Sequence, residues 1–217
     1  MLHWLLALLF PPRCVLCKSL LSKEETDLCA ACRKNAPEVK KSHFRFSFVA
    51  GWTAVWYYKD TVRSSLQRFK FHRRSNYAPA YGRILAMKLE KERPFSYDLL
   101  TYVPIAPLRR LKRGYDQVEL IANTVGAELG ITPCKTLRKI RNTPPQSSIS
   151  DPARRRANVL GAYRAIDPEQ LKGKRILLLD DIITTGATAS ECARVLLSAG
   201  AKEVFCAAVA VSTHKKG

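Results

Sequence analysis

The residues with the clearest chemical potential lie in one stretch, Arg175 to Thr188, which has the sequence RILLLDDIITTGAT. From Ile176 to Asp180, four consecutive apolar side chains lead into a carboxylate, a pattern typical of a strand buried on both faces of a parallel sheet. Asp181 and a two-residue apolar bend follow, and apolar residues recur at helical intervals from Ala189 onward. The stretch therefore predicts a strand, a loop and a helix, with two acids where the strand ends.

The loop offers the groups that bind a phosphorylated sugar. A helix N-terminus presents unpaired backbone N–H groups and the positive end of a dipole, and a glycine lets a phosphate approach the backbone. Asp180 and Asp181 can accept hydrogen bonds from sugar hydroxyls and face a hard divalent cation such as Mg2+. The pattern closely resembles the phosphoribosyl pyrophosphate (PRPP) loop of type I phosphoribosyltransferases. The expected phosphate-binding residues are Thr184, Thr185, Gly186, Ala187 and Thr188.

Two other interpretations of this stretch are weaker. A buried strand followed by an ordinary hydroxyl-capped helix needs one hydroxyl and no pair of acids. The magnesium-holding acidic strand of a P-loop nucleotidase needs a GxxxxGK[ST] segment, and the chain contains none. The acid pair and the hydroxyl-rich loop together therefore favour a sugar phosphate site.

Four cysteines near the N-terminus form a second chemical pattern, two CxxC pairs with eleven residues between them. Two close pairs of thiolates suit the tetrahedral coordination of zinc, and so short a segment would gain most of its folding free energy from the metal. The alternatives are two disulfides or a redox CxxC. Both are disfavoured, because the chain lacks signal-peptide features and contains three further cysteines. Such a closed site leaves no open coordination position, so its role is expected to be structural or that of a recognition surface rather than catalytic. The expected zinc ligands are Cys14, Cys17, Cys29 and Cys32. The expected core cysteines are Cys134, Cys192 and Cys206.

The charge of the chain indicates a polyanionic partner. Thirty-seven Lys and Arg against eighteen Asp and Glu give a formal charge of +19, which suits a phosphorylated substrate, nucleic acid or an acidic membrane surface. A solvated surface that keeps the protein soluble is the alternative. Between Leu129 and Ile166 the only acid is Asp151. The cations of that region are Lys135, Arg138, Lys139, Arg141, Arg154, Arg155, Arg156 and Arg164.

The chain of 217 residues has room for one domain of ordinary size and a small appendage. Met1 to Phe10 is apolar but too short to span a bilayer, and it lacks the basic start and small-residue end of a signal peptide. We expect a short packed helix there, with peripheral membrane contact as the alternative.

The elements that position these groups divide into two parts. Residues 1–40 are expected to form an N-terminal helix and the zinc module, and residues 41–217 one α/β domain. Its first part, residues 41–97, predicts a β-hairpin at Arg45 to Tyr58 and helices at Lys59 to Lys70 and Tyr77 to Glu92. Aromatic residues beside cations could stack on bases here, although a core-facing aromatic stripe is more common. The candidate nucleic-acid contacts are Arg68, Lys70, Arg73 and Arg74, together with Arg154, Arg155 and Arg156.

The second part, residues 98–217, predicts a Rossmann-like parallel sheet with helices on both faces. Ligands of such sheets bind at the carboxyl ends of the strands, so the basic loop Pro104 to Gly114, which follows a strand at Leu99 to Val103, is expected beside the acid pair. Asn142 to Asp151 is expected as an exposed loop that closes over the site. The cations expected to bind pyrophosphate are Arg109, Arg110, Lys112 and Arg113. The other expected strands are 137–140, 159–166, 174–180 and 203–211, and the other expected helices are 116–129, 153–157 and 187–199.

Several motifs in this order resemble the ComF (competence protein F) family of phosphoribosyltransferase-like proteins over nearly the entire chain. They are the four-cysteine segment, FKFH at Phe69 to His72, VPIAPLRRLKRGYDQ at Val103 to Gln117, PPQ at Pro144 to Gln146, RRRANVLGAY at Arg154 to Tyr163, and LLLDDIITTGAT. The family often has RGFNQ where this chain has RGYDQ, so Asp116 puts an extra negative charge near the expected pyrophosphate loop.

The resemblance implies a cytoplasmic bacterial protein that handles single-stranded DNA during natural transformation, with a DNA-uptake helicase or other competence proteins as partners. Three hypotheses remain open. The chain is a PRPP-sensing protein that binds single-stranded DNA, an enzyme that transfers a phosphoribosyl group to an unknown acceptor, or an adaptor between transport proteins that has only inherited the fold. In the first two, Asp180 and Asp181 would bind the ribose hydroxyls and Mg2+. The sequence identifies no general base, since His72 and His214 are candidates by residue type only.

Overall fold

The core of the protein is a four-stranded parallel sheet. The structure is a computed structural model that describes residues 11–40, 45–92, 96–144, 149 and 151–212. The sheet has the order β1-β6-β5-β2 and every neighbouring pair is parallel. The side chains from Ile176 to Leu179 are fully buried, as a strand covered on both faces requires. The strands are β1 (Gly51–Tyr57), β2 (Leu99–Tyr102), β5 (Arg175–Ile183) and β6 (Glu203–Val211).

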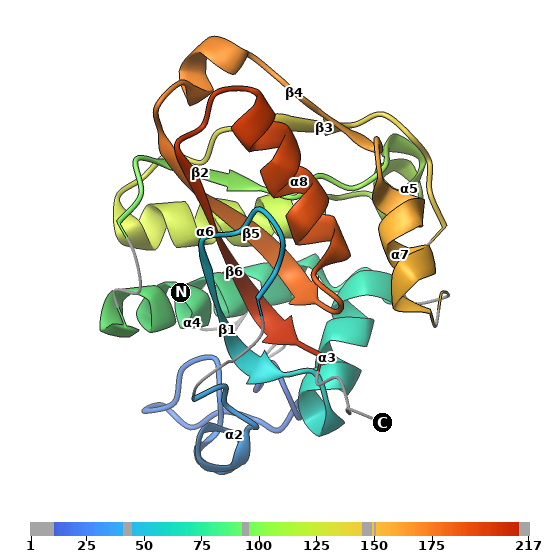
Figure 1. The fold of residues 1–217 in the computed structure, drawn as a ribbon. Helices are drawn as coiled ribbons and strands as arrows, with labels where there is room; N and C mark the ends of the chain where they lie inside the picture. The colour runs from blue at the N-terminus through green and yellow to red at the C-terminus, as the bar shows by residue number, and fades with distance from the viewer. Residues whose placement is uncertain (1–10, 41–44, 93–95, 145–148, 150, 213–217) are drawn as a thin grey trace.

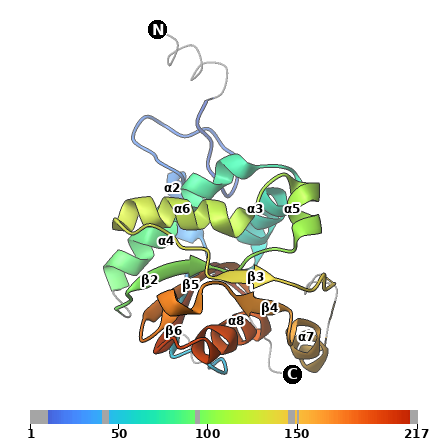
Figure 2. The same ribbon diagram turned by 90° about the horizontal axis from the view of Figure 1, so that it is seen from above.

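Helices cover both faces of this sheet, which confirms the predicted α/β architecture (Figure 1). Three helices, α3, α4 and α6, share one hydrophobic core with one face, and α8 packs on the other (Figure 2). A small antiparallel pair, β3 and β4, lies on the α8 side with α7. The helices are α2 (Ala30–Asn35), α3 (Asp60–Phe71), α4 (Ala78–Glu92), α5 (Pro107–Arg113), α6 (Gln117–Leu129), α7 (Pro152–Val159) and α8 (Ala187–Ser198). The remaining elements are η1 (Ser75–Tyr77), β3 (Leu137–Lys139), β4 (Tyr163–Ala165) and η3 (Pro168–Leu171).

The predicted hairpin at residues 45–58 is wrong. Only β1 forms there, and it pairs in parallel with β6, while Phe46 to Val49 make a turn in which Val49 N donates to Phe46 O at 3.3 Å. Thr53 to Trp56 are all buried, so the segment needs cover on both faces, which a two-stranded hairpin lacks. Its outer edge is closed by Pro37 to Val39, since Val39 N donates to Val55 O at 3.0 Å and Tyr57 N to Pro37 O at 2.7 Å.

Three other boundaries differ from the expectation. The strand of the acid pair continues to Ile183, because Ile182 and Ile183 still pair with β6. The predicted basic loop contains α5, which has a proline in its first turn and ends at Gly114 with a φ of +82°. The strand expected at residues 159–166 shrinks to β4, because Val159 ends α7. At the other edge of the sheet, Cys134 N donates to Leu100 O at 2.8 Å.

The cysteine segment packs directly on the α/β domain. Cys14, Val15, Leu16 and Leu28 belong to the same buried cluster as the inner side chains of α3 and α4. Its backbone is held by two polar groups of α3, since Arg68 Nη2 donates to Leu16 O at 2.5 Å and the Ser65 hydroxyl donates to Val15 O. The helix predicted for Met1 to Phe10 lies outside the described residues. Within the described part of the chain, no helix combines the length and apolar character needed to cross a bilayer.

Candidate functional site

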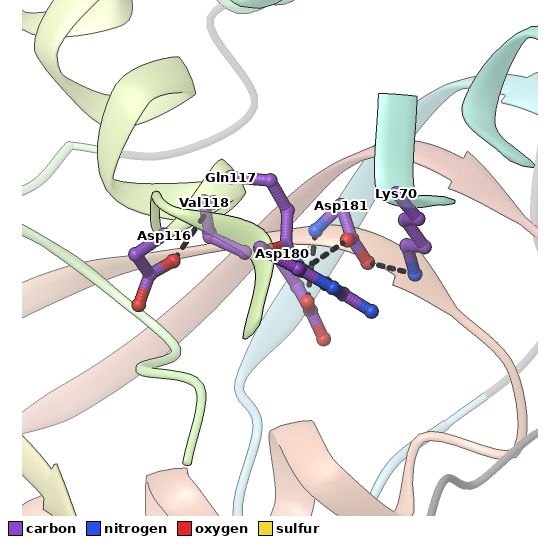
Figure 3. A network of polar contacts seen from close by, with 7 residues as sticks. Lys70, Asp116, Gln117, Val118, Asp180 and Asp181 are labelled. Atoms are coloured by element: carbon purple, nitrogen blue, oxygen red, sulfur yellow. Dashed lines mark hydrogen bonds and ion pairs between the residues drawn. The ribbon is translucent and has the colours of Figure 1, made fainter. Parts of the chain in front are cut away.

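The two acids of the sequence motif lie at the carboxyl end of β5, and both are nearly buried, with 8% of Asp180 and 4% of Asp181 exposed. Successive side chains of a strand point to opposite faces. Asp181 therefore faces α3 and α6, where Lys70 Nζ lies 2.8 Å from Oδ1 and Gln117 Nε2 donates to Oδ2 at 3.0 Å (Figure 3). Asp180 Oδ1 accepts the backbone N–H of Asp181 at 2.8 Å. The strand end thus holds two carboxylates, of which one is paired with a cation.

Asp180 has no such cation within hydrogen-bonding distance among the described residues. Its burial, followed by the nearby charge of Asp181, raises the pKa of Asp180 well above its ordinary value, and Lys70 lowers it by less. A sugar hydroxyl or a hard cation that reached this carboxylate would relieve that shortage of positive charge. Two carboxylates with free oxygen lone pairs are a donor set that suits Mg2+.

Gln117 links the acid pair to the basic helix α5. While its amide nitrogen donates to Asp181, its oxygen accepts from Arg113 Nη1 at 2.7 Å. Gln117 is the first residue of α6, so its position depends on the helix cap. That cap is Asp116, whose carboxylate accepts the backbone N–H groups of Val118, Glu119 and Ile105 at 3.0, 3.3 and 3.0 Å.

Asp116 lies against the predicted basic loop, because its carboxylate accepts the N–H of Ile105. The residue is 4% exposed and its oxygens are occupied by backbone donors. Burial raises the pKa of Asp116. Asn and Asp are about equally good helix N-caps, but only Asp has a second oxygen that can accept the N–H of Ile105. One carboxylate oxygen thus binds the start of α6, and the other binds Ile105 in the predicted basic loop.

The hydroxyl-rich loop joins β5 to α8 at this same end of the sheet. Gly186 precedes α8 with a φ of +75°, a conformation that side chains other than glycine rarely adopt. A Cβ at this position would lie 2.1 Å from Phe46 Cδ1, so the ring of Phe46 also excludes a side chain. The motif contains the glycine, but the contact with an aromatic residue from the segment before β1 could not be predicted from residue spacing. The Thr185 hydroxyl accepts Ala187 N at 3.4 Å.

The four cations expected for pyrophosphate do not converge on one point. Arg113 faces Gln117, Arg110 Nη2 lies 3.1 Å from Glu119 Oε2, and Arg109 Nη2 donates to the carbonyl of Thr143. Lys112 is exposed. Arg109 is half-buried, and burial lowers its pKa. Arg113 is thus tied to the acid pair, whereas Arg109 faces the segment after β3.

The sequence analysis counted Lys139 among the cations of residues 129–166 but did not identify it as a buried cation on β3. Only 8% of it is exposed, and its Nζ lies over the Tyr163 ring, 5.0 Å from the centroid. Burial, followed by the charge of Arg109, lowers the pKa of Lys139 to about 8, and Asp180 acts in the opposite direction. Nearby, Thr143 Oγ1 is buried and has no hydrogen-bond partner. The available sequence signal was the spacing, because Lys139 comes two residues after Leu137 in an expected strand and so shares its face.

The candidate nucleic-acid contacts lie in different environments. Arg68 holds the cysteine segment, Lys70 pairs with Asp181, and Arg73 and Arg74 line an open hollow at the end of α3. On α7, Arg154 and Arg156 are exposed, and Arg155 Nε donates to Ile149 O at 2.6 Å. Of the loop expected to close over the site, residues 145–148 and 150 lie outside the described part of the chain.

The four N-terminal cysteines form a metal site. Their sulfur atoms all lie within 4.8 Å of one another, and the Sγ atoms of Cys17 and Cys29 are 3.6 Å apart. Tetrahedral zinc with Zn–S bonds of about 2.3 Å requires sulfur separations of about 3.8 Å, so the cluster fits the metal. Cys29 also caps α2, with its sulfur accepting Cys32 N at 3.4 Å. Cys192 and Cys206 are fully buried, as expected, and Cys134 is half-buried.

Comparison with known proteins gives two family matches. Residues 5–43 match the double zinc ribbon domain, and residues 100–217 match the phosphoribosyl transferase domain. The DNA utilization protein YhgH of Salmonella typhi is 31% identical over 152 residues, 68% of this chain and 66% of that protein, so the match spans just under two thirds of its length. Competence protein F of Haemophilus influenzae is 24% identical over a match that covers 88% of this chain and 93% of that protein. Competence protein ComFC of Bacillus subtilis is 26% identical over a match that covers 86% of this chain and 78% of that protein.

The zinc module can be tested by removing one ligand. Cys17→Ser is expected to abolish zinc binding and to lower the free energy of unfolding by roughly 3 kcal/mol or more, because Val15 and Leu16 share the core of α3 and α4. Elemental analysis and thermal denaturation measure the two effects. Cys134→Ser, outside the cluster, is the control and should retain the metal. An unchanged zinc content in Cys17→Ser would contradict the assignment.

The buried lysine predicts a pH-dependent stability difference. Its pKa is about 8 in the folded protein against an ordinary 10.5, so folding disfavours the charged form. Lys139→Met should therefore raise the free energy of unfolding by roughly 1–3 kcal/mol below pH 8. The gain should shrink as the pH rises toward 10.5, where the unfolded chain also loses the proton. Urea denaturation at several pH values measures it. The exposed Lys202→Met is the control, and an equal pH profile for both variants would disprove the effect.

Proposed function

Because the chain belongs to the phosphoribosyl transferase domain family and to its ComF (competence protein F) members, we propose that it binds PRPP together with Mg2+. We further propose that it acts in handling single-stranded DNA during natural competence. The observation that carries the proposal is the acid pair at the end of β5, with Asp181 held by Lys70 and Gln117 and followed directly by the Gly186 loop. Acids and phosphate-binding amides on one strand–loop–helix unit suit a ribose that carries phosphate groups.

Each part of PRPP has candidate partners in this arrangement. Asp180 and Asp181 accept hydrogen bonds from the ribose 2′ and 3′ hydroxyls, and one of them holds Mg2+ directly or through water. The 5′-phosphate lies against residues 184–188 at the N-terminus of α8. The pyrophosphate group faces α5, where Arg109, Arg110, Lys112 and Arg113 lie. Mg2+ would supply positive charge to the pyrophosphate when it is bound.

Lys70 has to move for the ribose to reach Asp181 fully. The acid is 4% exposed because Lys70 and Gln117 cover its two oxygens. The ammonium group of Lys70 is the cation that compensates Asp181 in the free protein, and the incoming Mg2+ and hydroxyls would take over that role. The Lys70 side chain is 20% exposed, so a path to solvent exists for it.

The DNA part of the proposal follows from charge and from the relatives. The formal charge of +19 suits a polyanion, and the similar proteins carry the names DNA utilization protein and competence protein. Single-stranded DNA would contact the cations of α7 and of the turn after α3. A DNA-uptake helicase or other competence proteins are the proposed protein partners, and the cytoplasm is the proposed location. Peripheral contact with a membrane through Met1 to Phe10 remains a further proposal.

A phosphoribosyl transfer enzyme with an unknown acceptor and no DNA role is the second candidate. The observation that favours it is the positive charge of Lys139 and Arg109. Among the described residues, no carboxylate lies within hydrogen-bonding distance of either side chain. Transfer at C1 leaves pyrophosphate behind, and fixed cations that stabilise the leaving group in a site that excludes water would speed that step.

Calorimetric titration with PRPP and Mg2+ tests the pocket. Asp181→Asn should weaken PRPP binding by roughly tenfold or more, because the amide cannot act as a charged ligand. The matched control is Asp98→Asn, which also breaks an ion pair, with Arg175 at 2.9 Å, but at the amino end of the sheet. The control should bind PRPP like the unaltered protein.

Absence of binding to the unaltered protein would overturn both candidate functions. A screen for pyrophosphate release with nucleobases, ammonia and single-stranded DNA as acceptors then separates them. Release with any acceptor supports the enzyme, whereas PRPP binding without release, together with salt-dependent binding of an oligonucleotide, supports the DNA-handling protein.

A further inference from the structure

An open hollow lies where α3 ends, one residue beyond the lysine that pairs with Asp181. Its volume is about 520 Å3. Neither the acid pair nor the phosphate loop lines it, so the PRPP site does not account for it. Its lining residues are Phe71, His72, Arg73, Arg74 and Asn76, and none of these is acidic.

The hollow combines an exposed aromatic ring with cations. Phe71 is 66% exposed, an unusual position for a phenylalanine in a soluble domain. The guanidinium of Arg113 lies over its ring, 5.4 Å from the centroid. Because most of the side chain is still open to solvent, the ring can receive a second planar group.

The backbone around the hollow is fixed before any ligand arrives. His72 N donates to Arg68 O at 2.9 Å, and Tyr77 N donates to Arg74 O at 3.0 Å. The hydroxyl of Tyr115 donates to the carbonyl of Phe69, which ties the last turn of α3 to the segment before α6. A surface held in this way loses little conformational entropy on binding.

The chemistry of the hollow favours a single-stranded nucleic acid over other polyanions. A free nucleotide is bound best by an enclosed cleft, whereas an open hollow lets a chain enter and leave. Insertion into a membrane needs a broad apolar face, and Phe71 is the only large apolar side chain in the lining. Aromatic rings between cations match alternating bases and phosphates.

We propose that this hollow is a nucleotide subsite for single-stranded nucleic acid, in which Phe71 stacks on a base and Arg73 and Arg74 contact the adjacent phosphates. The proposal rests on the DNA-handling function and names the residues that carry it. The Arg113 guanidinium lies over the Phe71 ring and also donates to Gln117, which in turn donates to Asp181, so two side chains connect the subsite to the acid pair. Nucleic acid and PRPP are thereby brought to the same end of the sheet.

Fluorescence anisotropy with two labelled oligonucleotides tests the role of the ring. One is an oligothymidylate and the other has the same number of phosphates but no bases. Phe71→Ala should weaken binding of the oligothymidylate by roughly 5- to 150-fold and leave binding of the abasic strand unchanged, because only the first can stack. Phe71→Trp should retain binding of both. Phe48→Ala removes an exposed phenylalanine outside the hollow and is the control.

The two arginines are tested by the salt dependence of binding between about 50 and 200 mM salt. Arg73→Gln with Arg74→Gln should reduce the slope of log K against log salt by about 1.4, for both oligonucleotides, since each single-strand phosphate contact contributes about 0.7. The control is Lys174→Gln with Lys202→Gln, two exposed lysines at the amino end of the sheet. That control should leave the slope unchanged.

Three results would overturn the subsite while the DNA-handling function stands. They are an unchanged affinity in Phe71→Ala, an equal loss for the thymidylate and abasic strands, and an unchanged slope in the double arginine variant. Each leaves the DNA-handling function standing as long as the unaltered protein binds the oligothymidylate. If the unaltered protein binds neither oligonucleotide, the DNA-handling function fails and the subsite fails with it. Binding of anionic lipid vesicles that depends on Phe71, without oligonucleotide binding, would also exclude the subsite.

Discussion

Asp181 carries a charge at an almost fully buried position, and the groups that compensate this charge hold together distant parts of the chain. A buried carboxylate without partners is costly, so its two oxygens need a cation and a hydrogen-bond donor. Lys70 comes from the last turn of α3 and Gln117 from the first turn of α6. The end of β5 therefore fixes where one helix ends and where the other begins. The cap made by Asp116 sets the start of α6 and so completes this arrangement.

The same helix α3 connects the zinc module to the acid pair. Ser65 and Arg68 bind the backbone beside Cys14 and Cys17, and Lys70 lies two residues further along the helix. A disturbance of the cysteine segment would therefore reach the site through one rigid element. In this fold the metal module supports the end of α3 rather than standing apart from the α/β domain.

The sequence was sufficient for the parts of the structure that depend on local patterns. The buried strand before Asp180, the helices with apolar stripes and the cysteine cluster follow from residue spacing alone. The partners of Asp181 could not be predicted in this way, because Lys70 and Gln117 are 111 and 64 residues away from it in the chain. The hairpin prediction failed for a related reason. The aromatic pattern of residues 45–58 indicated a strand but could not show that its neighbour, β6, lies near the other end of the sequence.

Both outer strands of the sheet are covered where the structure describes them. Pro37 to Val39 close the free side of β1, and the backbone at Cys134 reaches β2. Exposed strand edges are where proteins recruit foreign strands, either in β-augmentation or in aggregation. The described edges of this sheet are therefore closed to an added strand, and this cover protects them against fibre-like self-association.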